Sequence, residues 1–305
     1  MQIRLLGTAA GGGVPQWNCN CAICREARAG SGRVRPRTQS SVSVSADGQH
    51  WFLLNASPDI RAQIESAPAL QPADGKVRGS PIEAVLLTNA DLDHTLGLLL
   101  LREGAKLRVH APAKVQHALT DGISVAPVLA SFCGIKWIEP AAETMPLLQR
   151  DGSPSGLLYQ AFPVPGHSPR FMKRRVFQSG NVVGYRITDE KTGGRLLFLP
   201  DVAALDEGLI KLLAECEMVL FDGTFWSEDE MRERGVGNLL ASDMGHVPIS
   251  GASGSLKVLA DVAAKHRIYV HINNTNPILL EDSPERAAVM AAGCSIGQDG
   301  MEFTI

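Results

Sequence analysis

The sequence predicts an α/β fold in which two mixed β-sheets pack together and helices cover their outer faces. Short apolar runs, typical of buried strands, recur along all 305 residues. Segments of helical periodicity follow strands in both halves of the chain, and the second half repeats the scheme of the first. No low-complexity tract or long linker separates the halves. We therefore expect residues 1–305 to form a single domain.

The first half begins with a strand at 3–6 that opens into a glycine-rich loop, 7–13. Its glycines suit a tight turn better than a phosphate site, because the spacing fits neither the Walker nor the dinucleotide pattern. Residues 41–45 alternate serine and valine, the period of a half-buried strand, and pair with 51–54 across Asp47-Gly48. Further strands are expected at 82–88 and 107–110, and helices at 95–102 and 113–119.

The second half contains strands at 182–187 and 196–199 that flank a hairpin turn at 190–194. A helix at 206–214, a buried strand at 218–221, a helix at 254–266 and a strand at 267–272 follow. The last helix, 284–292, has Ser283 as N-cap and proline at its first position.

Composition limits the class of protein. Apolar residues make up 45% of the chain, enough for a sizeable core, and the net charge of −3 argues against non-specific nucleic-acid binding. The N-terminus has no long apolar signal segment, and the apolar stretch 96–101 is far short of the roughly 20 residues that span a bilayer. We expect a cytoplasmic protein without nucleic-acid or membrane partners.

Three of the six cysteines, Cys19, Cys21 and Cys24, lie within one short loop at about 17–26. Reduced thiols at this spacing can supply three corners of a tetrahedral zinc site, with Zn–S distances of about 2.3 Å. The alternative is chance clustering. The loop therefore predicts a structural zinc whose fourth ligand comes from elsewhere, whereas Cys133, Cys216 and Cys294 are isolated and expected to be buried as small hydrophobes.

Carboxylate and imidazole side chains stand where apolar runs end. Because ligands gather at the ends of buried strands, these groups are expected to converge on one metal site. Its members are Asp91, Asp93, His94, His167, Asp201 and His271. Each has a plainer alternative: a helix N-cap for Asp91 or Asp93, a surface position for His167, a turn cap for Asp201 and a core position for His271.

Other polar residues are assigned less central roles. His246 is either a proton donor or a residue at a helix entry, and Asp59 is a turn residue or a support for the metal ligands. The histidines His50, His110, His117 and His266 are expected to be structural or on the surface. The segment 168–180 lacks periodicity and is expected to form a mobile loop over the pocket.

In order along the chain, the strand-end motifs resemble the metallo-β-lactamase superfamily, with its His-x-His-x-Asp-His motif, a later Gly-His, a strand-ending Asp and a last His. The matching residues are Asp93, His94, His167, Asp201 and His271. Asn89 and Asp91 stand where the first two histidines belong. The blocks at 11–21, 55–61, 222–226 and 271–277 resemble more closely a family of pyrroloquinoline quinone (PQQ) biosynthesis proteins within this superfamily.

The resemblance implies a metallo-β-lactamase-like four-layer αββα sandwich, a structural zinc at the cysteine triplet and a homodimer. It further implies iron- and dioxygen-dependent hydroxylation of the tyrosine ring in a peptide-derived glutamate–tyrosine PQQ precursor. In a related phosphodiesterase a histidine follows the last active-site ligand by three residues, so the corresponding Asn274 is the expected fourth zinc ligand. The precursor carries several carboxylates, which Arg170, Lys173, Arg174 and Arg175 are expected to bind unless they form a solvated basic loop.

The departure at Asn89 and Asp91 bears on the number of metals. One metal of a dinuclear hydrolase would here have Asn89, Asp91 and His167, and an amide oxygen is a poor ligand. The other metal would keep Asp93, His94 and His271, with Asp201 able to bridge. Two histidines and a carboxylate are the ligands of non-haem Fe(II) oxygenases. The sequence therefore favours one strong site, with Fe(II) expected and other divalent metals open.

Two alternatives remain at the level of sequence. A metal-dependent hydrolase or phosphodiesterase would keep the fold and most ligands, with two metals activating water. A non-catalytic carrier would use the pocket to hold PQQ or its precursor during transport to the periplasm.

Overall fold

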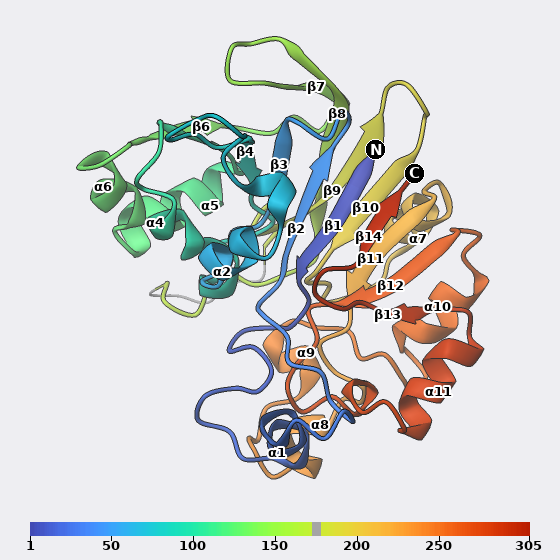
Figure 1. Ribbon diagram of the computed structural model, residues 1–305. Helices are drawn as coiled ribbons and strands as arrows, with labels where there is room; N and C mark the ends of the chain where they lie inside the picture. The colour runs from blue at the N-terminus through green and yellow to red at the C-terminus, as the bar shows by residue number, and fades with distance from the viewer. Residues whose placement is uncertain (173–177) are drawn as a thin grey trace.

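Two seven-stranded β-sheets pack face to face in the computed structural model of the chain, which describes residues 1–172 and 178–305 (Figure 1). The first sheet is antiparallel from β14 to β3 and parallel from β3 to β6. Its strands, in spatial order, are β14 (Glu302–Thr304), β1 (Gln2–Gly7), β2 (Ser41–Ser45), β3 (Trp51–Leu54), β4 (Ile82–Leu86), β5 (Leu107–His110) and β6 (Ile135–Ile138).

The second sheet has the same division into a parallel and an antiparallel part. It is parallel from β13 to β10 and antiparallel from β10 to β7. Its strands, in spatial order, are β13 (Ser295–Ile296), β12 (His266–Val270), β11 (Met218–Asp222), β10 (Arg195–Leu199), β9 (Val182–Asp189), β8 (Pro154–Val164) and β7 (Met145–Leu148).

Helices cover the outer face of each sheet, which gives four layers (Figure 1). The first sheet is covered by α2 (Ile60–Glu65), α4 (Gly97–Leu100), α5 (Ala113–His117) and α6 (Val125–Ala130). The second is covered by α7 (Glu207–Ala214), α10 (Ser255–Asp261) and α11 (Pro284–Ala291). The remaining elements are α1 (Ala22–Ala29), α3 (Leu92–Thr95), α8 (Glu230–Glu233), α9 (Ala241–Met244), and the short turns η1 (Pro68–Leu70), η2 (Ala118–Gly122) and η3 (Pro277–Leu279).

The apolar core has three parts that match these layers. Side chains of both sheets, including Phe52, Tyr185 and Phe198, fill the space between the sheets. Separate clusters lie between each sheet and its helices. The two mixed sheets and their covering helices confirm the predicted αββα sandwich. The helices among the described residues lack the combined length and apolar character needed to cross a membrane.

Several predicted elements have different bounds. The helix expected at 95–102 is two short helices, α3 and α4, and a Cβ at Gly97 would lie 2.3 Å from the carbonyl oxygen of Ser57, so the chain enters α4 in close contact with another loop. The helix expected at 254–266 ends at Asp261, and His266 already pairs with Met218 as the first residue of β12.

Strand β2 is buried on both faces, not half-buried as its alternation predicted. It lies inside the sheet, between β1 and β3, and covering layers bury the serines as well as the valines. The hairpin turns at 47–48 and 190–194 are confirmed, because β2 pairs with β3 and β9 with β10 in antiparallel register. Strands β6, β7, β13 and β14 and helices α1, α2, α6, α8 and α9 were not predicted.

Candidate metal centres

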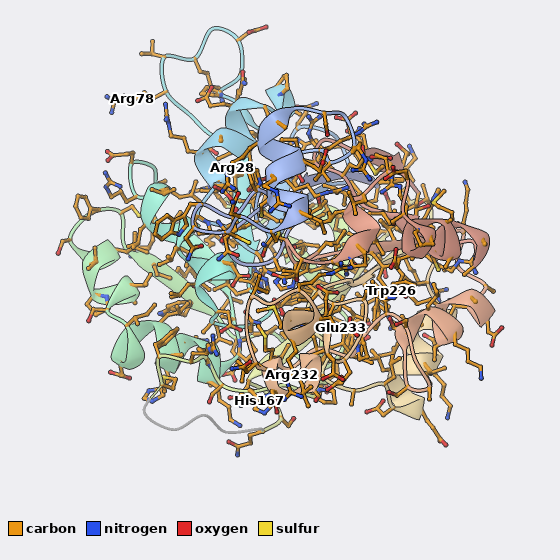
Figure 2. The ribbon with its side chains drawn as sticks, turned by 90° about the horizontal axis from the view of Figure 1, so that it is seen from below. Arg28, Arg78, His167, Trp226, Arg232 and Glu233 are labelled. Carbon is orange, nitrogen blue, oxygen red and sulfur yellow. The ribbon has the colours of Figure 1, made fainter. Side chains whose placement is uncertain are left out.

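A cavity of about 1250 Å³ lies where strands of both sheets end. Its lining includes residues that directly follow β4, β8, β10, β11 and β12. These are Asn89, Asp91, Asp93, His167, Asp201, Thr224 and His271. The cysteine loop and the segments of α8 and α9 also line the cavity. Figure 2 views the molecule from below, the side of Figure 1 on which α1, α8 and α9 lie, and labels His167. The predicted convergence of strand ends is therefore what the structure contains.

Asp93, His94 and His271 form one compact group of ligand atoms. One donor atom of each lies within 4.8 Å of the others. Asp93 Oδ2 is 3.1 Å from His271 Nε2 and 3.8 Å from His94 Nε2. All three side chains come from segments that follow buried strands, β4 and β12, so the rigid sheets fix their positions. This is the two-histidine, one-carboxylate set that the sequence predicted.

His94 has a ring nitrogen available for a metal. The residue is completely buried, and Nε2 has no hydrogen-bond partner among the described residues. Its Nδ1 lies 2.8 Å from Asn89 Oδ1, an acceptor, which assigns the proton to Nδ1 and leaves a lone pair on Nε2. A buried imidazole nitrogen without a partner is costly unless a ligand occupies it, so the donor set fits a divalent cation.

Asn89 holds this arrangement together, although it was judged from sequence only as a poor ligand. Its Nδ2 donates to Asp91 Oδ2 at 3.1 Å and to Asp201 Oδ2 at 3.0 Å. With Oδ1 on His94, the amide links one imidazole and two carboxylates. At this position the chain therefore uses a side chain that orients ligands.

His271 is oriented from the opposite side by Thr224 and Asp222. Thr224 Oγ1 lies 2.8 Å from His271 Nδ1 and 2.7 Å from Asp222 Oδ1. The carboxylate can only accept, so the hydroxyl donates to Asp222 and accepts from His271 Nδ1, which leaves His271 Nε2 facing Asp93. The backbone of His271 is left-handed, with φ 56°, a strained conformation for a non-glycine residue that turns the chain sharply at the end of β12.

A second group, Asp201, His246 and His271, lies next to the first and shares His271. His246 follows α9, and its ring stacks on His271 with centroids 5.5 Å apart. Asp222 Oδ2 accepts from His246 Nδ1 at 2.7 Å, so Asp222 supports both histidines. This is the arrangement in which a carboxylate fixes the tautomer of a metal-binding or proton-transferring imidazole.

The site has strongly shifted pKa values with opposing causes. Burial raises the pKa of Asp91 to about 7, assisted by the charges of Asp93 and Asp201. Burial would also raise the pKa of Asp93, but His94 and His271 outweigh it and hold this pKa below the usual range. For His271 burial acts downward, yet Asp201 and Asp93 raise the pKa to about 10. The carboxylates of Asp93 and Asp201 thus concentrate negative charge around His271, where a cation can compete with the proton on that ring.

Other predicted residues lie apart from these two groups. Asp91 and His167 line the cavity but belong to neither group of ligand atoms. Asp59 accepts hydrogen bonds from the backbone and side chain of Gln39 and thereby stabilises a loop. Arg170 lines the cavity, whereas Lys173, Arg174 and Arg175 fall outside the described residues.

The four histidines expected to be structural or on the surface lie outside both groups. His110 is buried in the core against Tyr159, His50 and His117 pair with nearby aspartates, and His266 begins β12. Sequence reasoning missed the orienting roles of Thr224, Asp222 and Asn89. The available signal for the first two was the block Asp222-Gly223-Thr224, which directly ends a buried strand.

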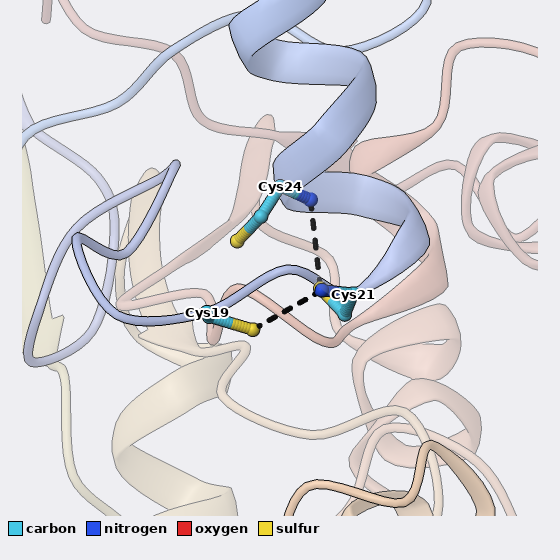
Figure 3. Close-up of side chains that lie close together, drawn as sticks. All are labelled: Cys19, Cys21 and Cys24. Carbon is cyan, nitrogen blue, oxygen red and sulfur yellow. Dashed lines mark hydrogen bonds between the residues drawn. The ribbon is translucent and has the colours of Figure 1, made fainter.

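The cysteine triplet forms a separate group of ligand atoms at the start of α1 (Figure 3). Cys21 is the N-cap of this helix, and its sulfur accepts from the amide of Cys24 at 3.5 Å, as the sulfur of Cys19 does from the amide of Cys21. Burial opposes ionisation of Cys19, but hydrogen bonds with Cys21, Cys24 and Asn274 outweigh it and lower the pKa of Cys19, whereas burial raises the pKa of Cys24 to about 11. The three sulfurs have the identity and spacing of a zinc site.

Asn274, which the resemblance implies as the fourth zinc ligand, lies beside the cysteine triplet. Its side-chain amide is 3.3 Å from Cys24 Sγ and 3.8 Å from Cys21 Sγ, with Nδ2 directed at the sulfurs. The loop 271–274 therefore carries one residue of each candidate metal centre, His271 and Asn274.

Comparison with known proteins agrees with this geometry. Residues 50–272 match the family described as the beta-lactamase superfamily domain. The zinc-bound crystal structure of PqqB from Methylobacterium extorquens superposes with a TM-score of 0.91 at 43% identity, covering 100% of both chains. A diphosphatase of the PhnP family, 20% identical, superposes with a TM-score of 0.67 over 99% of this chain and 96% of its own.

The fold and the strand-end ligands thus define a protein of the metallo-β-lactamase class. Coenzyme PQQ synthesis protein B of Methylobacterium nodulans is 47% identical over 100% of both chains, and that of Azotobacter vinelandii is 43% identical over the same share. The chain belongs to the coenzyme PQQ synthesis protein B family.

Proposed function

We propose that this chain is an iron- and dioxygen-dependent hydroxylase of PQQ synthesis, acting on the tyrosine ring of a peptide-derived glutamate–tyrosine precursor. The observation that carries the proposal is the group of Asp93, His94 and His271, with donor atoms within 4.8 Å of one another. Two imidazoles and one carboxylate suit Fe(II) and leave coordination positions for dioxygen and substrate. Membership of the coenzyme PQQ synthesis protein B family supports a role in PQQ synthesis.

The reaction replaces an aromatic C–H bond by C–OH. One atom of dioxygen enters the ring and the other becomes water, so a two-electron reductant must take part. Fe(II), when bound, would supply the electron transfer that makes dioxygen reactive. The residues of the chain then have distinct tasks: Asn89 and Thr224 fix the tautomers of His94 and His271, and His246, whose Nδ1 donates to Asp222, can accept and release a proton at Nε2.

We further propose zinc at Cys19, Cys21 and Cys24, completed by the Asn274 amide with its oxygen turned to the metal. Three adjacent sulfurs and the contact with Asn274 support this. The relative from Methylobacterium extorquens is described as Zn²⁺-bound, which is consistent with a zinc centre in the family.

A metal-dependent hydrolase is the second candidate function. The observation in its favour is the neighbouring group of Asp201, His246 and His271, which shares a ligand with the first group and offers a second metal position. Two adjacent metals can activate water without redox chemistry. A carrier that only holds PQQ or its precursor in the cavity is the third.

One reconstitution experiment separates these functions. The metal-free protein is loaded anaerobically with Fe(II), then given dioxygen, a reductant and a glutamate–tyrosine peptide precursor, and the product is analysed by mass spectrometry. A hydroxylase consumes dioxygen and adds oxygen to the tyrosine ring. Hydrolysis of a phosphodiester with zinc or manganese would support the hydrolase, and binding of PQQ without dioxygen consumption would support the carrier.

Variants sharpen the distinction between one metal and two. For a mononuclear iron site, His94→Ala and His271→Ala abolish activity, whereas Asp91→Ala and His167→Ala retain part of it, because neither side chain belongs to the first group. Equal and total loss in all four variants, with two metals bound at the active site of the parent protein, would show that Asp91 and His167 also support a second metal and would favour the dinuclear hydrolase instead.

A further inference from the structure

The cavity is acidic at its base and carries guanidinium groups on its exposed rim. The carboxylates of Asp91, Asp93 and Asp201 lie among the strand ends. Arg25, Arg170 and Arg234 also line the cavity, and all three are exposed, as is Glu233, whose carboxylate accepts from the Ser227 hydroxyl. The three arginines come from three separate parts of the chain: helix α1 beside the cysteine triplet, the segment after His167, and the residue directly after α8.

These arginines differ from many others in the protein. Among the described residues no ion pair joins Arg25, Arg170 or Arg234 to a carboxylate. Arg232, by contrast, pairs with Asp229 at 3.2 Å and donates to the carbonyl of Asn238. Arg25 has one terminal nitrogen fixed by the carbonyl of Asn20 at 2.7 Å, which orients its guanidinium group without neutralising it.

The orientation of charge indicates which ligands fit. A carboxylate at the rim meets planar guanidinium groups, which bind it through paired charge-assisted hydrogen bonds. The same group at the base would face the carboxylates of the strand ends and be repelled. A polycarboxylate with an aromatic body is therefore held by its acidic groups at the rim.

We infer that Arg25, Arg170 and Arg234 form a subsite for the carboxylates of a polycarboxylated aromatic ligand. The subsite directs the aromatic ring of this ligand toward Asp93, His94 and His271. This inference deepens the proposed hydroxylase function and rests on it for the identity of the ring. It assigns substrate recognition to α1 and to the residue that follows α8, and the sequence had indicated no such role for either.

Binding of PQQ, a polycarboxylated quinone, to the protein that carries zinc but no iron, under argon, tests the subsite without involving turnover. Arg25→Gln and Arg234→Gln should each weaken binding by about tenfold, as expected for losing one hydrogen bond to a charged group. Arg232→Gln is the matched control, two residues from Arg234 and already ion-paired, and should bind as the parent does. Benzenetricarboxylate should displace PQQ, and inorganic phosphate at the same concentration should not.

Zinc content is measured on every variant, because Arg25 contacts the backbone between Cys19 and Cys21. If Arg25→Gln loses zinc, Arg234→Gln decides the question. Unchanged PQQ binding in Arg234→Gln, or equal displacement by phosphate, would overturn the subsite. Loss of binding in the variants together with absence of hydroxylation in the parent would leave the subsite standing and reject the proposed function.

Discussion

The substitution Thr224→Val tests whether the hydrogen bonds around His271 set the affinity of the active site for metal. Valine has nearly the shape of threonine, so the change removes the hydroxyl and little else. The hydroxyl is buried and lies 2.8 Å from His271 Nδ1 and 2.7 Å from Asp222 Oδ1. Without it, His271 Nδ1 loses its acceptor, whereas Asp222 Oδ1 keeps the backbone amide of Thr224 at 3.0 Å.

The expected loss follows from this geometry. Removing a partner that orients a metal-binding histidine typically weakens metal binding by about 10- to 100-fold. This corresponds to about 1.4–2.7 kcal/mol at 25 °C. The buried nitrogen left without a partner also lowers the free energy of unfolding by about 1–3 kcal/mol, so affinity and stability must be measured separately.

Anaerobic titration with Fe(II) against a colorimetric chelator gives the affinity, and thermal unfolding of the protein that carries zinc but no iron gives the stability. Thr224→Ser keeps the hydroxyl and loses only a methyl group, so its affinity should remain close to that of the parent. Zinc content at the cysteine triplet should be unchanged in both variants. An Fe(II) affinity of Thr224→Val within about twofold of the parent would refute the argument, since the hydroxyl would then not orient His271.

Three further predictions concern other parts of the chain. Cys21→Ser should lose one zinc per chain and unfold at a lower temperature, as shown by metal analysis and calorimetry; full retention of zinc would exclude the cysteine site. Asn89→Ala should weaken Fe(II) binding by about tenfold although Asn89 is no ligand, because His94 Nδ1 loses its acceptor; an unchanged affinity would contradict the orienting role. Burial lowers the pKa of His110 to about 4, below the usual 6.5, so the unfolded chain binds more protons between these values and stability should fall by up to about 3 kcal/mol as the pH drops from 6.5 to 4. Denaturation curves across this range should show a smaller decline for His110→Phe, and an equal decline would assign the effect to other groups.

Local patterns in the sequence were sufficient for most of the second sheet and for placing the candidate ligand residues at strand ends. The runs at 196–199 and 218–221 are fully buried parallel strands, and such strands need no alternation to be recognised. Strands β4, β10 and β12 all end at one cavity. Ligands generally gather at such strand ends, so the acidic or imidazole residue after each apolar run could be named as a site candidate from the sequence alone.

Features that depend on contacts between distant segments were not predictable in this way. Gly97 interrupts a helical pattern because the loop at 56–57 passes directly against it, and nothing near Gly97 in the sequence indicates that loop. Similarly, the valines and serines of β2 have the alternation of a half-exposed strand, and only the covering layers show that both faces are buried. Burial of this kind is set by the assembly of layers rather than by the strand.

Asn89 shows how a sequence signature can identify a site and still misstate its chemistry. In the superfamily motif a metal-binding histidine stands at this position. Asn89 was therefore expected to contribute little to metal binding. In the structure its amide accepts from His94 and donates to Asp91 and Asp201, so it satisfies three groups that would otherwise compete in a buried, charged site. A histidine there could not provide two donors and an acceptor at once. Asn89 therefore stands where a metal ligand is expected and at the same time supplies hydrogen bonds that orient His94, Asp91 and Asp201, and both effects favour the proposed single metal site.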